Sequence, residues 1–219
     1  MNKLLVAVAT LTLSVMTFAS AEIRLGASIG VTTFDADGTE TLKSSSVKAN
    51  GSHSETVMVP ALFAEVGSSD KGIYLGFNYT DVAALGQKSK VRGTDFLSDN
   101  DTGTNVADAD LESLSSVYLL KTIGGRGFFA KLGIASADIK TKEQLATGST
   151  YGNVSVDGMV YGVGYQSNND TGYFFRAAYE MTDYDGFTLK GATDADGVNN
   201  SIKAEVDSSA FKIAFGKSF

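Results

Sequence analysis

The sequence predicts an all-β protein: a closed, eight-stranded antiparallel transmembrane β-barrel in which the strands follow one another as a meander. Three observations predict this fold. Segments of about ten residues alternate between apolar and polar side chains, which is the period of a β-strand. The connections alternate between tight, glycine-flanked turns and long polar stretches. The charged faces also carry many Gly, Ala and Ser residues, a mixture that suits a narrow barrel interior better than a solvated surface.

Eight alternating segments can be read along the chain. In the first, Ile23, Leu25, Ile29 and Val31 share one face and Arg24 lies on the other. The same sorting of bulky apolar residues against small or charged ones recurs in the later segments. The eight segments span residues 22–34, 56–67, 72–82, 114–124, 126–136, 157–167, 172–182 and 210–219.

Two of these segments have a weaker alternation. Residues 56–67 are apolar on both faces, and Glu65 assigns its own face to the polar side. For residues 114–124 the alternation does not decide which face points into the lumen. The charge of Lys121 favours placing its own face on the polar side, with Tyr118 and Leu120 on the apolar side.

The connections give the barrel a direction. Tight turns occupy residues 67–72, 124–127 and 167–172, and the Gly, Asn, Asp and Ser residues in them are typical turn formers. The long polar connections are expected at residues 36–55, 81–112, 137–156 and 183–207. With an even number of strands, both termini lie at the short-turn end. No linker divides residues 22–219, so we predict one barrel domain.

The uncharged faces are expected to contact lipid and the charged faces to line the lumen. A lipid-facing Lys or Arg at mid-depth costs about 2–4 kcal/mol. Glu65 and Glu180 are the expected acceptors for Arg24, Arg176 and Lys212. Such pairs would form either a packed plug or a hydrated, anion-preferring passage, and the small strand number favours the plug. The predicted lumen charge network comprises Arg24, Glu65, Lys121, Lys131, Arg176, Glu180 and Lys212.

Residues 1–21 read as a secretory signal peptide. Lys3 supplies the positive start, an apolar run follows, and Ala19 and Ala21 form an A-x-A cleavage site. The alternative is an uncleaved membrane anchor, but the apolar run is shorter than the ~20 residues that a spanning helix needs. We expect cleavage after Ala21 and export of the chain.

Composition excludes several functions. The net charge of −7 gives no support for nucleic-acid binding. Without cysteine and with one histidine, no disulfide, cysteine-ligated metal site or multi-histidine site can form. His53, Ser54 and Glu55 contain the residue types of acyl-transfer chemistry, yet sequence neighbours in a polar loop need not converge. We therefore expect no catalytic residues, no metal and no cofactor.

Acidic motifs recur in the predicted long connections, at residues 35–38, 98–103, 183–186 and 194–197. None continues to the Glu that closes a calcium loop at its twelfth position. Turn formation and solubility explain them, although divalent ions could bridge such carboxylates to lipopolysaccharide phosphates.

Taken together, the signal peptide, the eight alternating strands and the terminal Phe219 resemble a small Gram-negative outer-membrane β-barrel of the outer membrane protein A, outer membrane protein X and opacity-protein type. The resemblance covers residues 22–219. It implies that Phe211, Ile213, Phe215 and Phe219 form the signal read by the barrel-assembly machinery, from which Lys217 departs because an apolar residue is usual there.

The resemblance also implies a location in the outer membrane, in contact with its lipid and lipopolysaccharide. A monomeric, non-enzymatic barrel with a structural or surface-interaction role, and a surface ligand held by the long loops, is the expected function. A small passive-diffusion pore and a lipid A-modifying acyl hydrolase are the alternatives. A further alternative is a secreted soluble barrel whose apolar face points inward.

Overall fold

The computed structural model describes residues 21–41, 48–92, 103–142, 150–192 and 201–219. Residues 1–20 of the predicted signal peptide and the acidic motif at 194–197 lie outside these residues, as does nearly all of the motif at 98–103. Among the described residues, no helix is long and apolar enough to cross a membrane.

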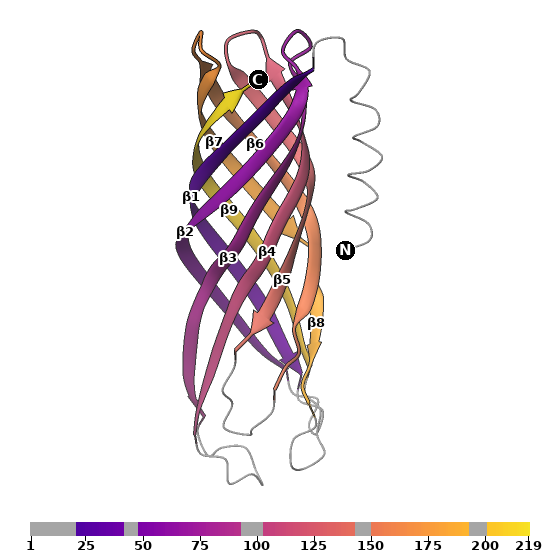
Figure 1. Ribbon diagram of the computed structural model, residues 1–219. Coiled ribbons are helices and arrows are strands. Elements are labelled where there is room, and N and C mark those ends of the chain that lie inside the picture. Colours follow the sequence, from indigo (N-terminus) through magenta and orange to yellow (C-terminus); the bar gives the residue numbers. More distant parts are fainter. Residues whose placement is uncertain (1–20, 42–47, 93–102, 143–149, 193–200) are drawn as a thin grey trace.

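The described chain forms one antiparallel meander that closes into a barrel (Figure 1). The strands from β1 to β7 pair in sequence order, and β9 pairs with both β7 and β1. The wall after β6 is built from two pieces, β7 and the short β8, which both pair with β9. The predicted eight-stranded fold is therefore confirmed. The strands are β1 (Glu22–Thr41), β2 (Lys48–Ser68), β3 (Ile73–Arg92), β4 (Gly103–Ile123), β5 (Phe128–Thr141), β6 (Val154–Asn168), β7 (Tyr173–Tyr184), β8 (Phe187–Lys190) and β9 (Ser201–Ser218).

The last residue completes the closure. The backbone N–H of Phe219 donates to the Ile23 carbonyl at 2.8 Å, and the N–H of Ile23 donates to the Phe219 carbonyl at 3.2 Å. The β1–β9 register runs without a break from this end to Thr41. A spanning barrel needs this, because an open edge in hydrocarbon leaves backbone groups unsatisfied.

A belt of bulky apolar side chains covers the outside of the barrel near the short turns. It occupies about nine residues of β1, from Ile23 to Val31, which is the length a tilted strand needs to cross a bilayer. Aromatic pairs lie at the short-turn end: Phe128 contacts Tyr165, and Tyr173 stacks on Phe215. The most exposed members of the belt include Met58, Leu62, Phe128, Leu132, Met159, Val163, Phe211 and Phe215.

The strands continue well past this belt, which corrects the predicted loop lengths. β1 and β2 pair as far as Thr41 and Lys48, and β3 and β4 pair as far as Arg92 and Gly103. Residues 36–55 are therefore mostly a hairpin. Outside the bilayer both strand faces can be polar, so the alternation that marks a spanning strand is lost although the backbone pairing persists.

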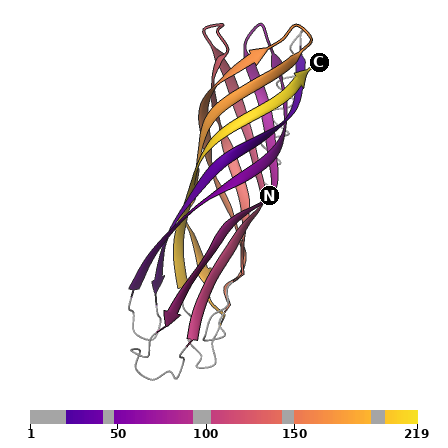
Figure 2. The same cartoon turned by 90° about the vertical axis from the view of Figure 1, so that its left-hand side faces the viewer.

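One seam interrupts the wall. The ladder between the described residues of β2 and β3 ends at Leu62 and Tyr79, although both strands continue. Pro60 lies just beyond this point and has no N–H to donate; its carbonyl instead accepts a hydrogen bond from the Thr80 hydroxyl at 3.0 Å. In Figure 2 the β1–β2 hairpin diverges from the β3–β4 hairpin towards the long-loop end.

Side chains fill the interior in two zones. Towards the long loops, an apolar cluster includes Phe34, Leu111, Ile139 and Tyr184. Towards the short turns, aromatic side chains surround buried charged groups. The lumen is thus a packed core rather than a wide channel, as expected for eight strands.

Candidate functional site: the ion networks of the lumen

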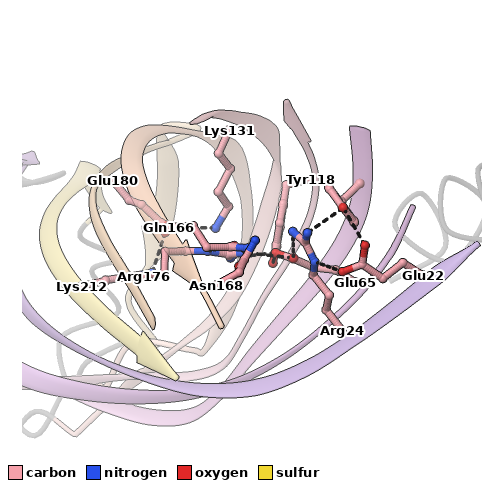
Figure 3. A network of polar contacts seen from close by, with 11 residues as sticks. Glu22, Arg24, Glu65, Tyr118, Lys131, Gln166, Asn168, Arg176, Glu180 and Lys212 are labelled. Atoms are coloured by element: carbon pink, nitrogen blue, oxygen red, sulfur yellow. Dashed lines mark hydrogen bonds and ion pairs between the residues drawn. The ribbon is translucent and has the colours of Figure 1, made fainter. Parts of the chain in front are cut away.

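Six of the seven residues in the predicted charge network lie inside the barrel, and they form two ion-paired groups (Figure 3). We call them the arginine group, built on Glu65, and the lysine group, built on Glu180. β1, β2 and β7 supply the charges of the arginine group, and β5, β7 and β9 supply those of the lysine group. Alternation along each strand directs these side chains inward.

Arg176 and Glu65 form the centre of the arginine group. The Arg176 guanidinium donates to both Glu65 oxygens, at 2.8 and 2.9 Å. It also donates to Gln166 Oε1 through Nε at 3.1 Å and Nη2 at 2.7 Å. The Tyr118 hydroxyl adds a third hydrogen bond to Glu65, at 2.8 Å. Both charges are buried, and such complete pairing offsets the cost of removing them from water.

Arg24 extends this group towards the short-turn end. Its Nε donates to Glu22 at 2.7 Å and its Nη2 to the Tyr74 hydroxyl at 2.6 Å. Its Nη1 lies 3.9 Å from Glu65 Oε2. The guanidinium also lies 3.5 Å from the centre of the Tyr74 ring, a cation–π contact. Two Arg and two Glu residues leave the arginine group formally neutral.

The lysine group has a different charge balance. Lys131 Nζ donates to Glu180 Oε1 at 2.9 Å, and Lys212 Nζ donates to Oε2 at 2.7 Å. Lys131 also lies 3.9 Å from the centre of the Tyr118 ring, which joins the two groups. Two Lys residues and one Glu leave the lysine group with a formal charge of +1.

Glycines make room for the large rings around these charges. A Cβ on Gly76 would lie 2.2 Å from the Tyr118 ring, and a Cβ on Gly216 would lie 2.4 Å from the Phe174 ring. Phe174 in turn lies 5.3 Å from the Arg176 guanidinium. Gly76 and Gly216 are therefore positions over which aromatic rings of neighbouring strands lie.

Lys121 lies outside the lumen, which corrects one predicted member of the network. The Lys121 side chain is exposed and donates to the Lys71 carbonyl at 2.5 Å. Tyr118 and Leu120 are buried inside, while Leu119 faces outward. Lys121 is close enough to the turn to reach water. Its charge therefore does not indicate which face of the strand points into the lumen.

Sequence reasoning missed the polar partners of the charges. Tyr74 and Gln166 lie on strand faces that the alternation already assigned to the interior. Their positions in the alternation could therefore have identified them as lumen residues. Tyr118 was missed because Lys121 reversed the facing of its strand. Glu22 and Asn168 lie at strand ends, where alternation carries little information; Asn168 accepts a hydrogen bond from Gln166 at 2.7 Å.

The candidate catalytic residues do not assemble. They lie on β2 rather than in a loop, so Ser54 faces away from His53 and Glu55. His53 Nε2 lies 3.8 Å from Glu55 Oε2, and Ser54 is exposed on the other face. A nucleophile and a base on opposite faces of one strand cannot form the hydrogen bond that activates the nucleophile.

The described acidic motifs are also part of the wall. Residues 35–38 lie in β1, and residues 183–186 end β7 and lead to β8. Within the described ranges, no group of three or more His, Cys, Asp or Glu residues is arranged to hold a metal ion.

The residues of the predicted assembly signal line the outside of β9. Phe211, Ile213, Phe215 and Phe219 are all exposed on the apolar belt or at its end. Lys217 lies 5.0 Å from the Tyr173 ring centre and 5.3 Å from that of Phe219. Its ammonium group thus lies over aromatic faces at the rim, which accommodates the departure at this position.

The closed meander, the outward apolar belt and the ion-paired lumen define a membrane-spanning β-barrel. Comparison with a solved outer-membrane protein supports this fold. The outer membrane protein OprG of Pseudomonas aeruginosa matches with a TM-score of 0.55 and 15% identity, over 92% of this chain and 96% of that one.

Two further solved structures match with lower scores. The Yersinia pestis attachment invasion locus protein Ail gives a TM-score of 0.36 with 14% identity, over 88% of this chain and 99% of that one. The Escherichia coli outer membrane protease OmpT gives 0.44 with 8% identity, over 93% and 99%. No protein-family model and no curated protein sequence matches the chain.

Proposed function

We propose that this protein is an integral, non-enzymatic barrel of the bacterial outer membrane with a structural and surface-interaction role. The observation that carries the proposal is the bidentate Arg176–Glu65 pair across the lumen. Together with the lysine group and the apolar cluster beyond it, this pair obstructs passage along the axis. The function then resides on the outside: the apolar belt anchors the protein, and the long-loop end faces the medium.

The wall that extends past the belt supports the surface role. β1 and β2 stay paired for ten residues beyond Val31, up to Thr41, and β3 and β4 extend similarly. Ordered hairpins raise the long connections above the lipid surface, where they would meet lipopolysaccharide sugars or an external ligand. The charged side chains that line the lumen are already ion-paired with one another, so they are not available to bind such a ligand.

Conductance of the purified barrel in planar lipid bilayers tests the proposal. A closed lumen predicts no reproducible channel at moderate voltage. Stable conductance that changes when Arg24 or Arg176 is substituted would instead establish the small pore. Lys121→Gln is the matched control, because this side chain lies outside the lumen.

Two separate observations test the location and the absence of enzymatic activity. In the detergent-extracted envelope, a folded barrel should migrate differently on a gel before and after boiling. Recovery in the soluble fraction with identical migration would contradict a membrane barrel. Lipid A should be the same in wild-type and deletion strains; a modification lost with the gene and with His53→Ala would establish the acyl hydrolase.

A further inference from the structure

A small cavity lies in the lumen between the lysine group and the apolar cluster. Its volume is about 50 Å³. One water molecule needs about 10–15 Å³ of the space that is open to the centre of a water-sized sphere, so there is room for a small ion together with a few water molecules. Lys212 and Glu180 line it together with apolar residues that include Phe34 and Val160.

The polar lining of the cavity includes several side chains that can donate hydrogen bonds. Thr32, Ser116, Thr182 and Ser208 contribute hydroxyl groups, and Asn78 contributes an amide. Thr32 is 5% exposed, and its Oγ1 is buried without a hydrogen-bond partner. A buried hydroxyl without a partner is costly, so this cavity has an unmet requirement for a polar occupant.

The charge balance specifies the sign of that occupant. Each carboxylate oxygen of Glu180 already accepts a hydrogen bond from one lysine, Lys131 or Lys212. The lysine group therefore keeps one positive charge that Glu180 does not neutralise. The arginine group beside it is formally neutral and does not compensate this charge. Lys131 and Glu180 are buried and the Lys212 side chain is 22% exposed, so a counter-charge close by would stabilise the excess positive charge. A cation would add to the excess, and water alone would leave it uncompensated.

We propose that this cavity is a binding site for a small monovalent anion of halide size. Lys212 supplies the charge, and Thr32 with the neighbouring hydroxyl groups and the Asn78 amide supplies hydrogen bonds. The single excess positive charge matches a monovalent anion, whereas sulfate or phosphate would over-compensate it. The site would make the lumen electrically neutral and stabilise the barrel against unfolding. It is a property of the interior and is separate from the proposed role at the surface.

Urea unfolding of the refolded protein in detergent micelles tests the site, with sodium bromide compared against sodium gluconate at constant ionic strength. A ligand that binds only the folded state raises the midpoint. We expect a saturable rise in bromide and none in gluconate or sulfate. Crystals soaked in bromide should give an anomalous peak between Thr32 and Lys212.

Three variants make the test specific. Thr32→Val should weaken bromide binding about tenfold, as loss of one hydrogen bond to a charged group predicts. Lys212→Met should abolish the saturable rise, whereas Glu180→Gln should strengthen binding by adding net positive charge. Thr33→Val is the matched control, because Thr33 is the next residue and bonds to Thr56 instead, at 2.8 Å.

Equal midpoints in bromide and gluconate for the wild-type barrel, with no bromide peak in the cavity, would overturn the proposal. So would a saturable rise that persists unchanged in both Thr32→Val and Lys212→Met. If Lys212→Met does not fold, Thr32→Val and its control still decide the result.

Discussion

Arg176 of β7 and Glu65 of β2 meet across the lumen in a bidentate ion pair, although 111 residues separate them in the sequence. Both side chains are at least nine-tenths buried. Removing one partner of such a pair leaves an uncompensated charge in a medium that solvates it poorly. Glu65→Gln should therefore lower the free energy of unfolding by about 3–5 kcal/mol, measured by urea unfolding in micelles.

The double variant Glu65→Leu/Arg176→Met tests whether the stability of the barrel depends on the ion pair itself or only on a filled lumen. Because the pair costs desolvation energy, replacing both partners by apolar groups should restore much of the lost stability. A double variant less stable than Glu65→Gln would mean that the network as a whole, including Tyr118 and Gln166, depends on these charges.

The barrel and most of its charged interior were predictable, because hydrocarbon imposes period-two alternation on every strand that crosses it. Arg24 and Lys131 could be placed by parity, and Glu65 by its own charge. Glu65 and Glu180 were predicted as the acceptors and do pair with Arg176 and Lys212, but the partner of Lys131 could not be predicted, because it depends on which side chains meet across the lumen. The wall beyond Phe34 was misread as loop, since water on both sides removes the pattern. The seam above Leu62 gave one local signal, the single proline of the chain, Pro60.

Gly76 tests whether strand glycines are required by the rings packed over them. A Cβ at this position would lie 2.2 Å from the Tyr118 ring, whereas a Cβ at Gly51 would meet nothing within 4 Å. Gly76→Ala should displace Tyr118 from Glu65 and destabilise the barrel by about 1–3 kcal/mol. Gly51→Ala, the matched control on β2, should be neutral or slightly stabilising. Equal effects in urea unfolding would refute the steric explanation.

Phe219 tests the difference between folding and assembly. Its side chain is exposed, so Phe219→Ala should barely change the stability of the purified barrel. If the residue is read during assembly, the same change should reduce the folded, heat-modifiable form in cell envelopes. Phe128→Ala removes another exposed aromatic ring at the same end and should leave assembly intact. Normal amounts of folded Phe219→Ala barrel in cells would argue against an assembly signal at this position.

The N-terminus of the exported protein tests the predicted cleavage. Residues Ala19 and Ala21 fit the small-residue requirement of signal peptidase, and β1 begins at Glu22. N-terminal sequencing of the envelope form should therefore start at Glu22. Ala21→Leu should leave a larger, uncleaved precursor, and Ser20→Leu, at the unrestricted position between them, should be processed normally. An envelope form that starts at Met1 would establish the uncleaved anchor instead.

A row of carboxylates crosses three strands just outside the apolar belt. Asp207 of β9, two outward positions past Phe211, pairs with Asp35 on one side and Asp183 on the other. Partial burial, the Asp183 carboxylate and the nearby Glu205 and Asp35 raise the pKa of Asp207. A pKa raised by folding means that the protonated form is favoured in the folded state. The contribution of Asp207 to stability is therefore full below the ordinary range of an aspartate, about pH 4, and is lost as the pH rises through the raised value.

Asp207→Asn should consequently stabilise the barrel at neutral pH and flatten the decline in the urea midpoint above about pH 4. The same change at Asp170, in the short turn at the opposite end, is the control and should leave the profile unaltered. High salt should shrink the difference, because it screens exposed carboxylates from one another. An Asp207→Asn barrel whose midpoint follows the wild-type profile at every pH would show that the three carboxylates do not repel one another measurably.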